Sequence, residues 1–222
     1  MKGRHELKFY INPLDYIELR TRLLVVAKPD ENSETRDGYK IRNLYFDNYA
    51  DKVVMEKLSG QAKREKFRIR YYKDDPSFIR LEKKSKYNRL VYKEYANITT
   101  EQCNLLLNCK YSHLKQSENP LLLELYSKIH YEILRPRIIV DYQREAYVYP
   151  MGKVRITIDS NIRTTNKVMG FFNPGLVTIP AAEAIILEVK YDNFIPAVIQ
   201  DIIQIDSRNQ TEFSKYMVAR FV

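Results

Sequence analysis

The sequence predicts an α+β fold in which about eight antiparallel strands form a closed or nearly closed barrel, with helices packed on its outside. Turn residues divide the middle of the 222-residue chain into strand-like segments that follow one another directly, as antiparallel neighbours do. Several strands carry mostly basic residues on one face and apolar residues on the other. Other segments show helical spacing and helix caps, so they are suited to cover the apolar faces. We expect one domain over residues 1–222.

The N-terminal part predicts a strand, a helix and a second strand. Residues 4–11 alternate as a half-buried strand does. Asn12 and Pro13 follow, and these residue types are favoured as the cap and the first residue of a helix. A polar turn at 30–38 then leads into a strand at 39–47.

The middle of the chain predicts a three-stranded meander. Its strands cover residues 64–73, 78–86 and 89–97. The turns between them are Asp74-Asp75-Pro76 and Tyr87-Asn88, which are too short for anything but antiparallel connections.

The C-terminal half mixes helices with a hairpin. Thr99 and Gln102 form a capping box that begins a helix, and 120–133 is a second, amphipathic helix. Strands at 137–149 and 153–160 form a hairpin that turns at Pro150-Met151-Gly152. The remaining elements are a connection at 164–180, a strand at 183–191, and short helices at 193–205 and 214–221.

The composition excludes several kinds of site. Lysine plus arginine number 37 and aspartate plus glutamate 28, and the net charge of +9 favours polyanionic partners. None of the six glycines lies in a P-loop or a dinucleotide-binding motif, so any phosphate must be held by side chains. The three histidines and two cysteines lack the spacing of a zinc site.

The sequence also bears on location. No stretch approaches the roughly 18 apolar residues of a membrane span, so we expect no transmembrane segment. The charged N-terminal residues contain no apolar core of a signal peptide, and two cysteines make no disulfide framework. We therefore expect a cytoplasmic protein.

The charged strand faces follow a recurring pattern. Glu-x-Lys occurs three times, at Glu6/Lys8, Glu82/Lys84 and Glu188/Lys190. If helices cover the apolar faces, the charged faces point at one another across a lumen. The lumen would then hold eight bases and four acids, a surplus of four charges that requires a polyanion such as phosphate. The bases are Lys8, Arg68, Arg70, Lys84, Lys93, Arg144, Arg155 and Lys190, and the acids are Glu6, Glu82, Asp159 and Glu188.

Simpler interpretations remain open for these residues. A charged strand face is most often a solvated outer face. Glu6, Glu82 and Asp159 can equally be ion-pair partners that orient the bases without holding a metal.

Several motifs together resemble one known family. They are Arg4-x-Glu6-x-Lys8, Arg68-Ile69-Arg70-Tyr71, Leu81-Glu82-Lys83-Lys84, Tyr142-Gln143-Arg144 with Val154-Arg155-Ile156, Leu187-Glu188-Val189-Lys190, and Ser214-Lys215-Tyr216. In this order they resemble the VTC domain, the catalytic part of the vacuolar transporter chaperone complex and of bacterial relatives. That domain belongs to the triphosphate tunnel metalloenzymes, also called CYTH-like.

The resemblance implies a phosphotransferase with an eight-stranded antiparallel tunnel. It would make inorganic polyphosphate from ATP with a divalent metal, commonly Mn²⁺ and alternatively Mg²⁺. The resemblance implies catalytic roles for Arg68, Arg70, Lys84, Arg144, Arg155 and Lys190. It implies phosphate-binding roles for Lys8, Lys93, Lys215 and Arg4, and a metal ligand in Glu188, with Glu6 and Glu82 as helpers.

The first strand favours the polymerase branch of the superfamily. The hydrolase and cyclase branches carry Glu-x-Glu-x-Lys there, and Arg4 replaces the first glutamate.

Other functions stay open at this stage. One alternative is a tripolyphosphatase in the same tunnel, with water as the acceptor. A second is a binding module for polyphosphate or nucleotide without turnover. Nucleic-acid binding is disfavoured because the bases face inwards. The expected partners are ATP and inorganic polyphosphate, while a membrane partner and the oligomeric state are left open.

Overall fold

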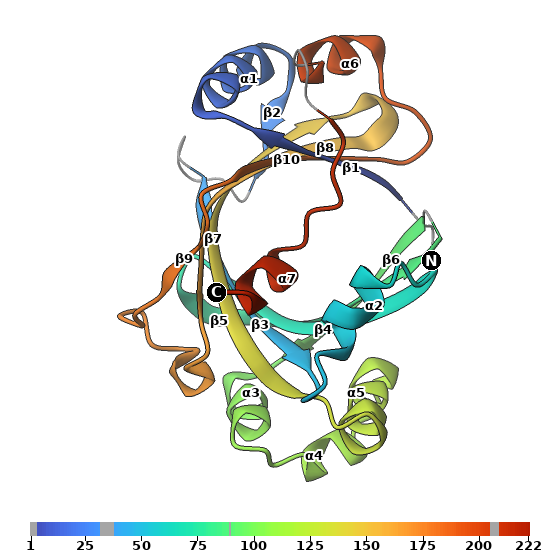
Figure 1. Cartoon of the computed structure of the whole chain (residues 1–222), viewed down its shortest axis with the longest axis vertical. Helices are drawn as coiled ribbons and strands as arrows, with labels where there is room; N and C mark the ends of the chain where they lie inside the picture. Colours follow the sequence, from blue (N-terminus) through green and yellow to red (C-terminus); the bar gives the residue numbers. More distant parts are fainter. Residues whose placement is uncertain (1–3, 32–37, 89, 205–208) are drawn as a thin grey trace.

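One antiparallel sheet of ten strands frames the molecule in the part of the chain that the structure describes (Figure 1). The structure is a computed structural model, and it describes residues 4–31, 38–88, 90–204 and 209–222. The strands are β1 (His5–Ile11), β2 (Lys28–Pro29), β3 (Tyr39–Asp47), β4 (Lys63–Tyr72), β5 (Asp75–Tyr87), β6 (Leu90–Ile98), β7 (Arg135–Tyr149), β8 (Val154–Thr165), β9 (Ile179–Ala182) and β10 (Ile185–Tyr191).

Seven α-helices accompany the sheet within these described ranges. They are α1 (Pro13–Val26), α2 (Lys52–Leu58), α3 (Thr100–Leu107), α4 (Ser112–Lys115), α5 (Pro120–Tyr131), α6 (Ala197–Ile203) and α7 (Lys215–Arg220). Two short 3₁₀ helices, η1 (Met151–Lys153) and η2 (Val168–Gly170), lie in turns.

The sheet is curled but is not a closed barrel. Eight strands are hydrogen-bonded in the order β1-β10-β8-β7-β3-β4-β5-β6, while β2 pairs with β7 and β9 with β8. Among the described residues, the two end strands, β1 and β6, meet through one bridge between Arg4 and Val91, where the Arg4 amide donates to the Val91 carbonyl at 3.3 Å. The antiparallel α+β class is confirmed, whereas the closed eight-stranded barrel is not, because no ladder joins the two edges in the part of the chain that the structure describes.

Most helices cover the convex face of the sheet, as expected. Leu19 and Leu23 of α1 and Ile199 of α6 share an apolar core with Ile156 and Val189 on the strands. At the other end of the molecule, the helices α3, α4 and α5 cover β4 and β5 (Figure 1). Burying these aliphatic side chains stabilises the fold by roughly 1.5–3 kcal/mol for each one.

Two helices lie on the concave face instead, which corrects the expectation that helices pack only outside. Figure 1 shows α7 inside the curve of the sheet, with α2 near the opposite edge. Tyr216 of α7 and Val54 of α2 share a core with Tyr45 and Ile138. This end of the concave face is apolar, so it needs helices to exclude water.

The helix caps follow the expected chemistry. Asn12 Oδ1 accepts a hydrogen bond from the Asp15 amide at 2.8 Å, and Asp15 Oδ2 accepts from the Asn12 amide at 2.9 Å. Thr99 and Gln102 form the predicted capping box at the start of α3. These caps satisfy amide groups that have no partner within the helix.

Several predicted boundaries need correction. In the connection expected at 164–180, Thr164 and Thr165 belong to β8, and Ile179 and Pro180 belong to β9. The helix expected at 193–205 begins only at Ala197, after Pro196. The sequence analysis also missed α2, α4, β2 and β9. Residues 32–37 of the predicted turn, Arg89 of the predicted strand and Ile205 of the predicted helix lie outside the described residues.

Within the described residues, no helix combines the length and apolar character needed to cross a bilayer.

Candidate functional site

The concave face encloses a cavity of about 690 Å³ with a strongly basic lining. Thirteen basic side chains and three acidic ones line it among the described residues. The bases are Arg4, Lys8, Lys66, Arg68, Arg70, Lys73, Arg80, Lys84, Lys93, Arg144, Arg155, Lys190 and Lys215, and the acids are Glu6, Asp75 and Glu188. All ten residues expected to be catalytic or phosphate-binding are therefore in one cavity.

The hairpin of β4 and β5 arranges cations in rungs along the cavity. Directly paired residues are Lys66 with Lys84, Arg68 with Glu82, and Arg70 with Arg80. Because side chains alternate along a strand, residues two apart share a face, about 6.6–6.8 Å from one rung to the next. The strand pairing thus produces a ladder of charged groups with a regular spacing.

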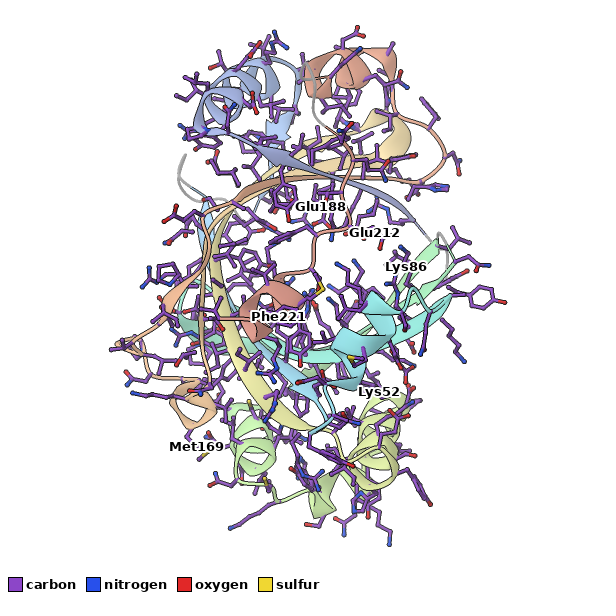
Figure 2. All side chains as sticks on the ribbon, in the orientation of Figure 1. Lys52, Lys86, Met169, Glu188, Glu212 and Phe221 are labelled. Atoms are coloured by element: carbon purple, nitrogen blue, oxygen red, sulfur yellow. The ribbon has the colours of Figure 1, made fainter. Side chains whose placement is uncertain are left out.

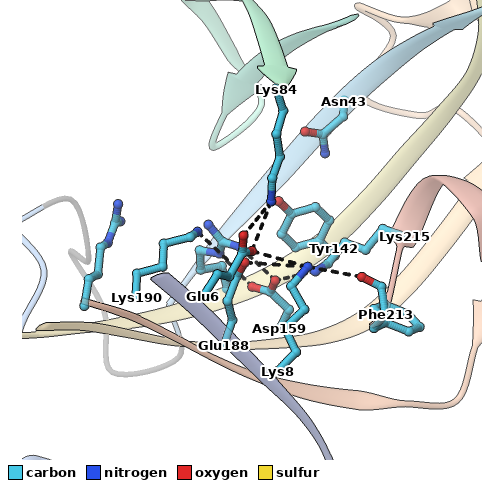
Figure 3. Close-up of polar contacts among 12 residues, drawn as sticks. Glu6, Lys8, Asn43, Lys84, Tyr142, Asp159, Glu188, Lys190, Phe213 and Lys215 are labelled. Atoms are coloured by element: carbon cyan, nitrogen blue, oxygen red, sulfur yellow. Dashed lines mark hydrogen bonds and ion pairs between the residues drawn. The ribbon is translucent and has the colours of Figure 1, made fainter. Parts of the chain in front are cut away.

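Strands β1 and β10 face this ladder with alternating charges. Glu6 pairs with Lys190 and Lys8 with Glu188 across the two strands. Lys84, which comes from β5, donates to both carboxylate oxygens of Glu6 at 2.7 and 3.1 Å (Figure 3). This contact joins the two sides of the curled sheet across the cavity.

Glu6 and Glu188 share a lysine. The Lys8 Nζ atom lies 3.3 Å from Glu6 and 3.7 Å from Glu188 (Figure 3). Lys190 Nζ also lies 3.2 Å from Glu188. The two carboxylates thus already surround a cation.

Asp159 joins β7, β8 and α7 at one side of the cavity. The guanidinium of Arg144 donates to both of its oxygens, at 2.6 and 2.7 Å. Lys215, at the start of α7, also contacts Asp159, and its Nζ atom lies 4.7 Å from the centre of the Tyr142 ring. The concave position of α7 is what brings Lys215 into the site.

Arg68 and Arg70 are held by different partners. Arg68 Nε donates to Glu82 at 2.8 Å, and Lys93 also contacts this carboxylate. Arg70 is buried, and it donates to Asn43 Oδ1 and to the Tyr142 hydroxyl, each at 2.7 Å. These neutral partners fix the direction of Arg70, and the nearest carboxylate, that of Glu82, lies 3.9 Å from its NH1 atom.

Arg155 and Arg4 are more peripheral. Arg155 NH2 lies 2.8 Å from Asp30, and Arg4 Nε lies 2.7 Å from Asp192. Both residues line the cavity, yet an acid outside it already holds each guanidinium.

Burial in this basic cavity shifts the protonation of its lysines. Desolvation is the largest cause, and it lowers the pKa of Lys66 and Lys84 well below the usual value. It lowers the pKa of Lys93 and of Lys190 to about 8, although Glu82 and Glu6 act in the opposite direction. A bound anion beside these lysines would therefore stabilise their charged form.

The pKa values of the carboxylates also fall, which for an acid favours the charged form. Burial alone would raise the pKa of Glu6, but Lys84, Lys8 and Lys190 outweigh it and lower that pKa. Burial likewise opposes ionisation of Asp159, and Arg144 and Lys215 lower its pKa. The acids are thus ionised, and the cavity still carries a cationic surplus.

The three expected metal ligands do not form one cluster. Among the described residues, no group of three or more histidine, cysteine, aspartate or glutamate side chains is placed to hold a metal ion. Glu6 and Glu188 are near each other around Lys8, whereas Glu82 is engaged by Arg68 and Lys93.

Two cations on the β4–β5 ladder were not among the predicted site residues. Lys66 shares a face with Arg68 and has no carboxylate partner among the described residues, and Arg80 stands opposite Arg70. The alternation of β4 and β5 already placed both on the charged face, so this signal was sufficient to find them.

A second cavity of about 640 Å³ opens at the other end of the ladder. Arg64 and Lys86 form the next rung there, beside Lys57 of α2. Glu212 reaches this end, and its carboxylate lies 2.7 Å from Lys86 Nζ and 3.6 Å from Arg64 (Figure 2). The two cavities share Lys66 and Lys84 in their linings, so they adjoin along the ladder, and we call the two together the passage.

Several solved structures are similar to this chain, and the one with a TM-score above 0.5 supports the fold. A Bacillus halodurans protein provisionally named an adenylate cyclase superposes with a TM-score of 0.59 at 15% identity, over 96% of this chain and 94% of that one. A Vibrio parahaemolyticus protein with the same provisional name gives a TM-score of 0.45 at 11% identity, over 90% and 82% of the chains. The Mimivirus capping enzyme triphosphatase gives 0.41 at 12% identity, over 90% and 85%.

The sequence comparisons identify the family of the chain. No curated protein matches the chain. The model of the VTC domain matches residues 3–221, nearly the whole sequence. The chain therefore belongs to the VTC domain family.

Proposed function

We propose that this chain is a polyphosphate polymerase that transfers the γ-phosphoryl group of ATP to the end of a growing inorganic polyphosphate chain. The observation that carries the proposal is the ladder of cations along the two adjoining cavities, with thirteen bases against three acids in the larger one. A linear polyanion is the ligand that neutralises charges spaced regularly along a narrow passage. The VTC family membership supports the same assignment.

The phosphate ligands divide into arginines and lysines with different tasks. Arg68, Arg70, Arg144 and Arg155 offer planar, bidentate donors that orient phosphate oxygens. Lys84 and Lys190 add compact charges on opposite sides of the cavity. Lys8, Lys93, Lys215 and Arg4 extend the binding surface for the rest of the chain of phosphates.

The transfer itself needs positioning more than covalent help. The terminal oxygen of bound polyphosphate forms a bond to the γ-phosphorus, the bond from that phosphorus to the β,γ-bridging oxygen breaks, and ADP leaves. Charge grows on the leaving oxygen, where guanidinium and ammonium groups stabilise it. Arg70 is suited to the transferred group because its hydrogen-bond partners, Asn43 and Tyr142, are uncharged, and Glu82 is no nearer than 3.9 Å.

A divalent metal, Mn²⁺ or Mg²⁺, fits Glu188 and Glu6. Their carboxylates already surround one cation, the Lys8 ammonium, and such metals are commonly held by one or two carboxylates plus substrate phosphates. When bound, the metal would neutralise phosphate charge. Glu82 acts in our proposal as the ion-pair partner that orients Arg68 and Lys93.

The test is to incubate the purified protein with ATP and Mn²⁺ and to measure polyphosphate and free phosphate separately. We expect polyphosphate, and we expect Arg70→Ala to lower the rate by at least ~100-fold, as loss of a transition-state charge contact does. The matched control is Lys63→Ala, an exposed cation at the end of β4. Free phosphate without polymer would support the tripolyphosphatase alternative, and binding without turnover would support the binding-module alternative.

A further inference from the structure

Aromatic side chains surround Arg80 where the larger cavity ends near the β4–β5 turn. Tyr72, Phe78 and Arg80 line the cavity there. The Arg80 guanidinium lies 4.4 Å from the centre of the Phe78 ring and 4.7 Å from that of Tyr95, on the neighbouring strand β6. These distances are those of cation–π contacts, so the Arg80 guanidinium joins the two rings into one group.

The two rings keep open surface. Phe78 is 42% exposed and Tyr95 is 58% exposed, although both lie on the concave side of the sheet. Arg80 Nε, in contrast, is buried and has no hydrogen-bond partner among the described residues. Since buried polar atoms are normally paired, the group has both stacking surface and donor capacity left for a ligand.

The position of this group relates it to the phosphate ladder. Arg80 forms the rung with Arg70, and Phe78 lies two residues further along β5. From Glu82, the partner of Arg68, to Phe78 is roughly 13 Å along the strand. A nucleotide whose phosphates lie on the Arg68 and Arg70 rungs therefore has its nucleoside end directed at these rings.

From this geometry we infer that Phe78, Arg80 and Tyr95 form the nucleobase subsite for the donor nucleotide, with the base stacked on the exposed rings. The inference rests on the proposed function, because it uses the ladder as the triphosphate site. Stacking on aromatic rings needs no base-specific hydrogen bonds, so the subsite would accept any purine nucleoside triphosphate.

This assignment also sets the direction in which the nucleotide enters and the polyphosphate leaves. The donor nucleotide enters at the mouth of Phe78 and Tyr95, and its phosphates point inward along β4 and β5. Polyphosphate then leaves past Lys66 and Lys84 toward the mouth with Arg64 and Lys86, which extends the same ladder.

The test compares two ligands that both carry three linked phosphorus centres, of which only one carries a nucleoside. Binding of β,γ-imido ATP and of inorganic tripolyphosphate is measured by calorimetry for the unaltered protein and for a Phe78→Ala/Tyr95→Ala double variant. We expect the double variant to bind the ATP analogue roughly 5- to 150-fold more weakly, which corresponds to the loss of stacking on one base. Its affinity for tripolyphosphate should stay within about twofold, as expected for side chains that touch no phosphate.

Two further variants test whether a loss of affinity comes from misfolding. The Phe78→Tyr/Tyr95→Phe variant keeps both rings and should bind the ATP analogue as the unaltered protein does. Tyr131→Ala removes a ring that is 87% exposed at the end of α5 and should change neither affinity. An unchanged affinity of the double variant for the ATP analogue, or an equal loss for both ligands, would overturn the subsite while leaving the phosphate ladder intact. If the unaltered protein bound neither ligand, the proposed function itself would fail.

Discussion

At the scale of single residues, buried carboxylates organise the cations of the cavity. Asp159 has no exposed surface, and it holds Arg144 and Lys215. Glu82 is 1% exposed and holds Arg68 and Lys93. Buried charges are costly unless they are paired, so each acid makes it feasible to keep two cations in a low-dielectric cavity.

This arrangement predicts that Asp159→Asn is strongly destabilising. The change leaves Arg144 and Lys215 without their counter-charge, and breaking a buried pair in this way costs about 3–5 kcal/mol. The free energy of unfolding at pH 7 from urea titration measures the loss. Asp201→Asn, on the exposed side of α6, is the control and should change stability by less than about 0.5 kcal/mol.

The ion pairs of Asp159 also predict how the free energy of unfolding changes with pH. The pKa of Asp159 is lower in the folded than in the unfolded protein, so its stabilisation is present above the unfolded value of about 3.9 and is lost as pH falls through the folded value. The stability difference between the unaltered protein and Asp159→Asn should therefore shrink in acid. A difference that stays constant down to the lowest pH at which both proteins fold would contradict the ion-pair explanation.

The residues of the site were largely predictable from the sequence because alternation is a local property. Once β4 and β5 are recognised, Arg68 and Arg70 must share one face of β4, and Arg80 and Lys84 one face of β5. The partner of each charge was not predictable in this way. Lys84 contacts Glu6, which is 78 residues away in sequence, and only the curl of the sheet brings the two together.

At the scale of elements, helix α1 shows how the convex face is covered. Leu23 has no exposed surface and packs into the core with Val189, whereas Leu14 on the same helix is 76% exposed. We predict that Leu23→Ala lowers the free energy of unfolding by about 2–5 kcal/mol, because it removes a buried side chain and leaves a cavity. The control is Leu14→Ala, with an expected change within about 0.5 kcal/mol. Similar losses in the two variants would mean that α1 does not pack as described.

The missed helix α2 has a physical explanation. Its N-cap residue, Asp51, has a φ of 51° and makes no side-chain hydrogen bond to the helix, so the usual capping signal is absent. Tertiary contacts hold this seven-residue helix instead: Val54 is buried beside α7, and Arg220 of α7 donates to both oxygens of Asp51 at 2.9 and 2.8 Å. A helix that depends on such distant partners is not visible in local sequence.

The concave position of α7 is a similar case. Its apolar pattern predicts a face that packs, but not which side of the sheet receives it. The Tyr216 hydroxyl donates to Asp47 at 2.6 Å and Ser214 caps the helix, and these contacts direct Lys215 into the cavity.

At the scale of the whole molecule, closure of the sheet was beyond sequence reasoning. The charge pattern predicts that the polar faces point at one another, and the cavity agrees with that. Whether the edges join depends on how far the twist and curl of ten strands accumulate, and no local pattern encodes this sum. In the described ranges, the bridge between Arg4 and Val91 is the one that joins the two edges.

The charge of the whole cavity predicts that binding of polyanions weakens in alkaline solution. Burial lowers the pKa of Lys93 and of Lys190 to about 8 in the free protein. A bound polyanion favours the charged ammonium and raises both pKa values, so binding takes up protons above pH 8. The affinity for tripolyphosphate should therefore be highest below pH 8 and fall above it, by up to about tenfold per pH unit for each lysine.

The control variant keeps the positive charges at positions 93 and 190 but replaces the lysines with residues that do not lose their protons in this pH range. A Lys93→Arg/Lys190→Arg variant remains cationic up to pH 10, because arginine does not lose its proton in this range. Its affinity for tripolyphosphate, measured by calorimetry from pH 7 to pH 10, should fall less steeply with pH than that of the unaltered protein, because two of the titrating lysines are gone. Glu6, Arg144, Arg155 and Asp159 act on Lys190, and Glu82, Arg68 and Arg70 act on Lys93, but none of these charges differs between the two proteins. If the unaltered protein and the variant lose affinity in parallel, Lys93 and Lys190 do not titrate in this range, and the prediction for these two lysines is wrong.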